Sequence, residues 1–123
     1  MTSNTLKFVW ENKIHSISNL DPNETILNYV RLKLKKTGTK EGCAEGGCGA
    51  CTVVLGDVKN NKIIYQAINS CIAFVPSLEG KQLILVEDLV SKNGALHTVQ
   101  DAMINYHGSQ CGFCTPGFVM SLF

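Results

Sequence analysis

Four cysteines in a fixed spacing constrain this chain more than any other feature. Cys43, Cys48 and Cys51 are spaced C-x4-C-x2-C, and Cys71 follows after nineteen intervening residues. This arrangement is the plant-type pattern for a [2Fe–2S] cluster. Two irons bridged by two sulfides take four thiolates, so a short loop can supply three while a separate element supplies the fourth. The spacing therefore predicts that these four cysteines bind one [2Fe–2S] cluster and that the chain carries single electrons.

Glycines make up four of the ten residues from Gly42 to Cys51, namely Gly42, Gly46, Gly47 and Gly49. Glycine reaches backbone dihedrals with positive φ and lets the main chain approach a bound group closely. Backbone N–H groups can then point at the cluster sulfurs, where their dipoles stabilise the negative charge of a thiolate-ligated centre. We expect these glycines to form the cluster-binding loop.

Two other uses of the four cysteines are less consistent with the pattern. A structural zinc site prefers two close pairs, such as C-x2-C…C-x2-C, and Cys43 and Cys71 do not fit that arrangement. Buried cysteines without a metal would leave the four glycines unexplained. Glu45 is expected to be a solvated loop residue, because carboxylates rarely hold such clusters.

The composition is that of a globular protein of 123 residues with a net charge of +1. A charge this close to zero excludes bulk electrostatic attraction to nucleic acid or membrane. The N-terminal residues lack the features of a secretory signal, and no run approaches the about 20 apolar residues that span a bilayer. We therefore expect a cytoplasmic location, where six cysteines are metal ligands, redox groups or buried apolar residues rather than three disulfides.

Hydrophobic patterning predicts an α+β chain in two parts. Strands are expected at residues 6–10, 13–18, 52–55, 62–67 and 82–86, with tight turns at residues 11–12 and 58–61. A helix is expected to start near Pro22, with an apolar face made by Ile26, Leu27, Val30, Leu32 and Leu34. Further helices are expected at residues 98–106 and 116–123. These elements suggest a strand-rich domain over residues 1–88 and a helical one over residues 89–123.

A second cysteine pair, Cys111 and Cys114, forms C-x2-C before Thr115 and Pro116. A thioredoxin-like dithiol is one interpretation, although that motif should follow a strand and here follows a helical pattern. Half of a zinc site is a second interpretation. Half of another iron–sulfur cluster is the third, and it needs two more cysteines. The pair by itself leaves all three open.

Three segments together resemble a known family. TGTKEGCAEGGCGACTVVL, NSCIAF and HGSQCGFCTPGFVMS resemble the iron–sulfur region of the xanthine dehydrogenase and aldehyde oxidase family of molybdenum hydroxylases, over nearly the whole chain. Within the family, GSQCGFCTPG looks most like the xanthine dehydrogenase subunit that carries iron–sulfur and FAD domains. One departure is Val86-Glu87-Asp88, where the family usually has Val-Glu-Gly.

The resemblance implies a fold and a ligand set. The first domain would be a plant-ferredoxin-like β-grasp with one cluster, and the second a four-helix bundle with another. Cys111 and Cys114 match the first ligand pair of that second cluster, and its other pair is expected beyond Phe123. Gln110 matches a family glutamine that lies against the molybdopterin. The chain would thus be a truncated part of a larger enzyme.

The resemblance also implies a function. Electrons would pass from a molybdopterin site through the two clusters to FAD and then to NAD⁺, with an FAD domain and a molybdopterin-binding subunit or domain as partners. No substrate chemistry is expected in this chain, since His15, His97 and His107 are scattered and Asp57, Asp88 and Asp101 are expected to be solvated. A free-standing ferredoxin-like carrier is the alternative.

The expected truncation has two consequences. The helical segment should be poorly stable alone, because an unfinished bundle leaves several apolar side chains without partners, namely Met103, Phe113, Phe118, Val119 and Leu122. Metal analysis of the chain should give about two irons, from the one complete set of four thiolates.

Overall fold

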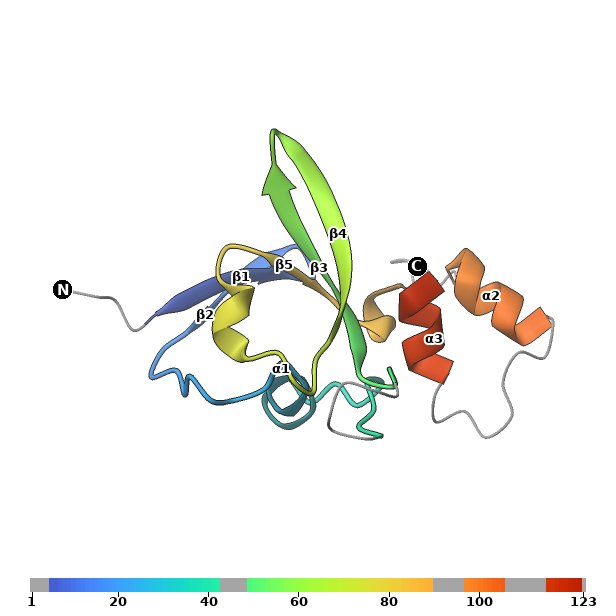
Figure 1. The fold of residues 1–123 in the computed structure, drawn as a ribbon, viewed down its shortest axis with the longest axis horizontal. Coiled ribbons are helices and arrows are strands. Elements are labelled where there is room, and N and C mark those ends of the chain that lie inside the picture. Colours follow the sequence, from blue (N-terminus) through green and yellow to red (C-terminus); the bar gives the residue numbers. More distant parts are fainter. Residues whose placement is uncertain (1–4, 43–48, 90–96, 106–114, 123) are drawn as a thin grey trace.

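A five-stranded mixed sheet forms the body of the protein (Figure 1). The computed structural model describes residues 5–42, 49–89, 97–105 and 115–122. The strands are β1 (Leu6–Trp10), β2 (Lys13–Ile17), β3 (Thr52–Lys59), β4 (Lys62–Asn69) and β5 (Gln82–Ile84), in the spatial order β2-β1-β5-β3-β4. β1 and β5 run parallel and all other neighbours are antiparallel. The five predicted strands are confirmed, and the architecture is consistent with a ferredoxin-like fold.

Two hairpins are closed by two-residue turns that the sequence predicted. Glu11 and Asn12 have φ of 54° and 61°, and Asn60 and Asn61 have φ of 53° and 62°. Positive φ at both central residues matches the right-handed twist of the paired strands, which is why asparagine is favoured there. The β3–β4 hairpin is long, and its tip projects away from the body of the molecule (Figure 1).

The helix after β2 starts later than predicted. It begins at α1 (Ile26–Asn28), with the Thr25 hydroxyl accepting a hydrogen bond from the Asn28 N–H at 3.2 Å. The predicted start near Pro22 is wrong, because the Asp21 carboxylate accepts from the Asn23 N–H at 2.9 Å and holds this segment in a turn instead.

The same helix continues as a π-helical segment, η1 (Tyr29–Lys33). In this segment the Leu34 N–H donates to the Tyr29 carbonyl, five residues back. Leu32 is 70% exposed, so its predicted place on the apolar face is wrong. At 3.6 residues per turn a residue two positions after Val30 points to the opposite side of the helix from the buried Ile26 and Val30.

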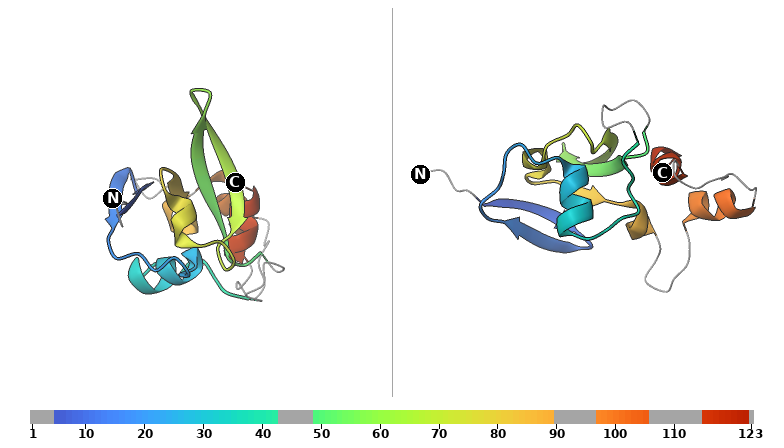
Figure 2. Two further views of the ribbon diagram at one scale, coloured as in Figure 1. Left: turned by 60° about the vertical axis from the view of Figure 1, so that its left-hand side comes forward. Right: turned by 90° about the horizontal axis from the view of Figure 1, so that it is seen from below.

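One face of the sheet carries the hydrophobic core. α1 and η1, together with the 3₁₀ helix η2 (Val75–Leu78), pack there (Figure 2). The core is built from alternate residues of the strands and the inward side chains of these helices, namely Leu6, Phe8, Trp10, Ile26, Tyr29, Val30, Val53, Leu55, Val75, Leu78, Leu83 and Leu85. This packing holds the ends of β3 and β4 in place beside α1.

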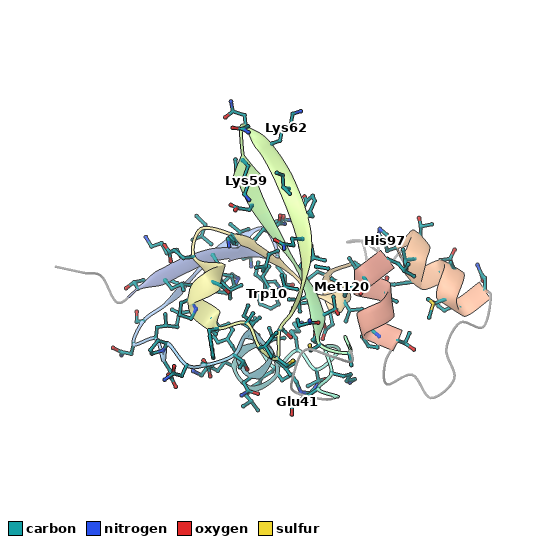
Figure 3. The ribbon with its side chains drawn as sticks, in the orientation of Figure 1. Trp10, Glu41, Lys59, Lys62, His97 and Met120 are labelled. Carbon is teal, nitrogen blue, oxygen red and sulfur yellow. The ribbon has the colours of Figure 1, made fainter. Side chains whose placement is uncertain are left out.

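A 3₁₀ helix, η3 (Val86–Leu89), follows β5 and binds back to β1. The Asp88 carboxylate accepts hydrogen bonds from the Trp10 indole N–H and from the Leu85 N–H, both at 2.9 Å. Trp10 lies in the middle of the molecule (Figure 3). The prediction of a solvated Asp88 is therefore wrong, since the buried indole needs an acceptor and Asp88 provides it.

Two helices lie at the opposite end of the sheet from β2 (Figure 1). They are α2 (Thr98–Asn105) and α3 (Thr115–Leu122), and α3 packs beside β3. Val119 was expected to lack a partner but is only 3% exposed, because α3 docks on the sheet; Leu122 is 64% exposed as expected. The predicted four-helix bundle stays a prediction. No helix in the described ranges is long and apolar enough to cross a membrane.

Candidate metal centre

The β3–β4 hairpin brings together two of the predicted ligands. Thr52 pairs with Asn69 at the end of the antiparallel ladder, so Cys51 lies opposite Ser70, and Cys71 is the next residue. Two hydrogen bonds extend the pairing, because the carbonyl of Cys51 accepts from the Ser70 hydroxyl at 2.6 Å and from the Ser70 N–H at 3.4 Å. Two cysteines far apart in sequence therefore lie at the same end of one hairpin.

The turn that carries Cys71 is held from two sides. The Ile72 and Ala73 N–H groups both donate to the Asn69 carbonyl, which closes the turn. The Leu27 N–H donates to the Ser70 carbonyl at 3.0 Å, and the Ile26 N–H to the Ala73 carbonyl at 2.9 Å. The first residues of α1 thus fasten this turn, so Cys71 is presented by the core and not by a mobile loop end.

The end of the cysteine loop is equally well fixed. Gly49 has φ of +76°, a conformation that residues with a Cβ rarely adopt. Its carbonyl accepts from the Thr52 N–H at 3.1 Å and from the Thr52 hydroxyl at 2.6 Å. The Ala50 carbonyl accepts from the Lys40 N–H at 3.2 Å. Three successive carbonyls, those of Gly49, Ala50 and Cys51, are therefore hydrogen-bonded.

The chemistry of this corner suits a thiolate-bound cluster. Cys51 is 1% exposed, and its sulfur lies 4.0 Å from the amide oxygen of Asn69. Thr39 directly precedes Lys40, whose N–H donates to the Ala50 carbonyl in the loop. The buried Thr39 hydroxyl has no hydrogen-bond partner among the described residues. Neither of the two described cysteines of the set, Cys51 and Cys71, is in a disulfide, and both lie at the same end of the hairpin, where their sulfurs can serve as thiolate ligands. The residues present therefore fit a [2Fe–2S] group.

The structure brings together some of the predicted site residues and does not describe others. Gly42 is exposed, at the last described position before the loop, and Gly49 is described above. The remaining predicted residues lie outside the described residues, namely Cys43, Gly46, Gly47, Cys48, Gln110, Cys111 and Cys114. Within the described ranges, no group of three or more metal-ligating side chains gathers.

Four residues contribute to this corner although the sequence analysis did not single them out, namely Thr39, Thr52, Ser70 and Gly117. Thr52 follows Gly49 by three residues, the spacing at which a threonine hydroxyl caps a turn. For Ser70, the only indication in the sequence was its position directly before Cys71. Gly117 is a lone glycine in a helical pattern, which indicates a packing reason.

The described histidines have structural roles. The His15 ring lies within hydrogen-bond distance (3.2 Å) of the Trp10 carbonyl and stacks on Phe8 at 5.6 Å between ring centroids. His97 caps α2, since its Nδ1 accepts from the Val99 N–H at 3.2 Å. Figure 3 places His97 at the start of α2. Both histidines are thus engaged in local packing and capping, and His107 lies outside the described residues.

Comparison with known families matches both cysteine motifs. The family described as "2Fe-2S iron-sulfur cluster binding domain" matches residues 12–76, and the family described as "[2Fe-2S] binding domain" matches residues 85–123. The chain therefore belongs to the [2Fe–2S] iron–sulfur cluster binding proteins.

Curated relatives define the family more narrowly. The chain is 50% identical to a xanthine dehydrogenase of Blastobotrys adeninivorans over 98% of this chain, and 47% identical to a xanthine dehydrogenase/oxidase of Felis catus over all of it. It is 45% identical to aldehyde oxidase 1 of Oryctolagus cuniculus over 85% of this chain. The chain spans about 9% of the length of the first two relatives and 8% of the third.

Solved structures agree with this assignment. Quinoline 2-oxidoreductase from Pseudomonas putida 86 matches with a TM-score of 0.76 and 28% identity, over 94% of this chain and 65% of that one. The aldehyde oxidoreductase from Desulfovibrio desulfuricans matches with a TM-score of 0.77 and 31% identity, over 96% of this chain and 12% of that one. The chain is thus homologous to the electron-transferring iron–sulfur region of the xanthine dehydrogenase and aldehyde oxidase oxidoreductases, as the resemblance predicted.

Proposed function

We propose that Cys43, Cys48, Cys51 and Cys71 bind one [2Fe–2S] cluster and that this chain transfers single electrons inside a xanthine dehydrogenase-like molybdenum hydroxylase. The observation that carries the proposal is the meeting of Cys51 and Cys71 at one end of the β3–β4 hairpin. The spacing of the other two cysteines in a glycine-rich loop supports it. Family membership supports the wider setting.

The residues around the site have separate tasks in this proposal. A [2Fe–2S] group supplies storage of one electron at low potential, near roughly −400 mV for the plant type. The Ser70 hydroxyl binds the carbonyl of Cys51 and so holds Cys51 beside the turn that carries Cys71, and the Thr52 hydroxyl binds the carbonyl of Gly49 and so fixes the last turn of the cysteine loop. Burial of Cys51 excludes water from its sulfur, and Gly42, Gly46, Gly47 and Gly49 let the loop backbone approach.

The second half of the proposal concerns residues 89–123. We assign residues 1–88 to a ferredoxin-like β-grasp domain and residues 89–123 to the beginning of a four-helix [2Fe–2S] domain. Cys111 and Cys114 would supply half of the second ligand set, and Gln110 would contact the molybdopterin. Electrons would then pass from the molybdopterin site through both clusters towards FAD.

The partners in this proposal are other parts of the same enzyme, an FAD domain and a molybdopterin-binding domain or subunit. The small share of the relatives' length that the chain spans supports such further domains. A cytoplasmic location is part of the proposal, since thiolate ligands persist in a reducing compartment. A free-standing carrier is less consistent with the packing of α3 on β3.

Metal analysis with matched cysteine variants tests the first cluster. The 123-residue chain, purified without air, should bind about two irons and two sulfides and show a paramagnetic signal on one-electron reduction. Cys51→Ser and Cys71→Ser should each lose most of this iron, while the matched variant Cys111→Ser should keep it. Zinc in place of iron, or equal losses in all three variants, would contradict the ligand assignment.

A further inference from the structure

Gly117 is the third residue of α3, and a side chain has no room there. The residue is buried, and a Cβ built on it would overlap the carbonyl oxygen of Gly49. It would also lie 2.9 Å from the Gly49 carbonyl carbon and from the Ala50 Cα, a separation that real Cβ atoms do not show. The helix therefore meets the loop backbone to backbone. Gly117 follows Cys114 by three residues, and the contact on the loop lies between Cys48 and Cys51.

The loop side of this contact cannot easily retreat. Thr52 binds the Gly49 carbonyl through both its N–H and its hydroxyl, and Lys40 binds the Ala50 carbonyl. Ser70 binds the Cys51 carbonyl from the other strand of the hairpin. A loop displaced by a methyl group would lose several of these hydrogen bonds together.

The helix side is anchored as well. Met120 is 1% exposed and Val119 is 3% exposed, so two side chains in the turn of α3 that follows Gly117 are buried. Met120 lies where α3 faces the base of the β3–β4 hairpin (Figure 3). Close packing at these side chains allows little sliding. A larger residue at position 117 would therefore push the start of α3 away from Gly49 and Ala50.

Glycine is a poor choice for this helix on intrinsic grounds alone. In an exposed helix interior, replacing glycine by alanine favours the folded state by roughly fivefold in the equilibrium constant. The contact with Gly49 and Ala50 opposes that gain. The sign of the effect of Gly117→Ala therefore distinguishes a close-approach role from an incidental glycine.

We propose that Gly117 is a positioning residue that sets how closely the first turn of α3, which begins directly after Cys114 in the sequence, approaches the end of the cysteine loop at Gly49 and Ala50. This inference rests on the proposed function. If two clusters exchange single electrons across this contact, the rate of electron transfer between them falls as the distance between them increases. Such a transfer moves one electron and makes or breaks no bond. The contact itself, however, depends only on described residues.

The test compares Gly117→Ala with the matched control Ser121→Ala, an exposed position of the same helix, in the whole enzyme and in the 123-residue chain. In the chain, Gly117→Ala should lower the equilibrium constant for folding and speed amide exchange in α3, whereas Ser121→Ala should do neither. In the reduced whole enzyme, Gly117→Ala should keep its full iron content and weaken the magnetic coupling between the two paramagnetic centres.

A double variant tests the rigid loop. Thr52→Val removes the hydroxyl bond to Gly49, so Gly117→Ala should cost less in the Thr52→Val background than in the wild type. If Gly117→Ala alone does not fold, the comparison is whether the double variant with Thr52→Val recovers folding. If Gly117→Ala raised the equilibrium constant for folding by about fivefold and left the magnetic coupling unchanged, the inference would be overturned. Absence of iron from the wild-type chain would instead overturn the proposed function and leave the contact supported by the stability data.

Discussion

The hydroxyl of Ser70 donates a 2.6 Å hydrogen bond to the carbonyl oxygen of Cys51, nineteen residues away in the sequence. Ser70 is completely buried, and its own carbonyl accepts from the Leu27 N–H. This one residue therefore joins the cysteine loop, the turn that carries Cys71 and the start of α1. Ser70 thus holds Cys51 beside the turn that carries Cys71, although the sequence analysis did not single it out.

Replacing Ser70 by alanine should lower the free energy of unfolding by about 1–2 kcal/mol, because a buried carbonyl loses its stronger donor. Iron should also be lost faster to a chelator, since Cys51 and Cys71 are no longer held together. Ser77→Ala is the matched control: its hydroxyl donates to the Phe74 carbonyl at 2.7 Å, but the residue is exposed. Denaturant unfolding and timed iron release measure both effects, and equal behaviour of the two variants would exclude this role for Ser70.

Asp88 should make stability depend on pH. Burial raises the pKa of its carboxyl above the ordinary value of 3.8, while the hydrogen bonds from Leu85 and Trp10 lower the pKa by less. The folded state therefore binds a proton more tightly than the unfolded state does. The free energy of unfolding should fall as pH rises from the unfolded pKa, near 3.8, through the raised folded pKa, and then stay level with respect to this group.

Asp88→Asn should remove that fall and leave stability at neutral pH equal or higher, because the amide oxygen can still accept from Trp10 without a buried charge. Urea unfolding at several pH values, followed by Trp10 fluorescence, gives the comparison. An Asp88→Asn profile that keeps the wild-type slope would show that another group titrates.

The Asn60-Asn61 turn should discriminate sharply between substitutions. Asn61 has φ of 62°, so Asn61→Gly should stabilise the β3–β4 hairpin and Asn61→Ile should destabilise the protein by about 1–2 kcal/mol. Lys62→Ile, one residue later in ordinary strand conformation, is the control for added apolar surface. Thermal unfolding measures all three, and similar values for the two isoleucine variants would contradict a left-handed conformation at position 61.

Removing iron should loosen one part of the chain selectively. If the cluster links Cys51 and Cys71, its loss should speed amide exchange at Thr52, Ser70 and Ala73, which lie at the end of the hairpin. The β1–β2 hairpin is paired over five residues away from the cysteines and should exchange as before. Hydrogen exchange with and without an iron chelator measures this. Uniform acceleration throughout the sheet would mean that the cluster supports the whole fold.

Local patterns alone were enough to predict the strands, the tight turns and the candidate ligands. The run Leu6–Trp10 indicated β1, and residues 58–61 indicated the hairpin turn, which the structure places at Asn60 and Asn61. Both signals act between near neighbours, so they survive in a single sequence. The cysteine spacing is likewise a local property, because a short loop must supply three thiolates to one group.

Tertiary contacts decided the features that no local pattern contains. Asp88 lost part of its expected exposure because Trp10, 78 residues earlier, needed an acceptor. Val119 found partners because α3 docks on β3 through the backbone contact at Gly117. Each of these outcomes depends on which surfaces meet in space. The sequence by itself determined the strands and predicted the cysteine chemistry, whereas only the folded chain determined how Cys51, Cys71 and α3 come together.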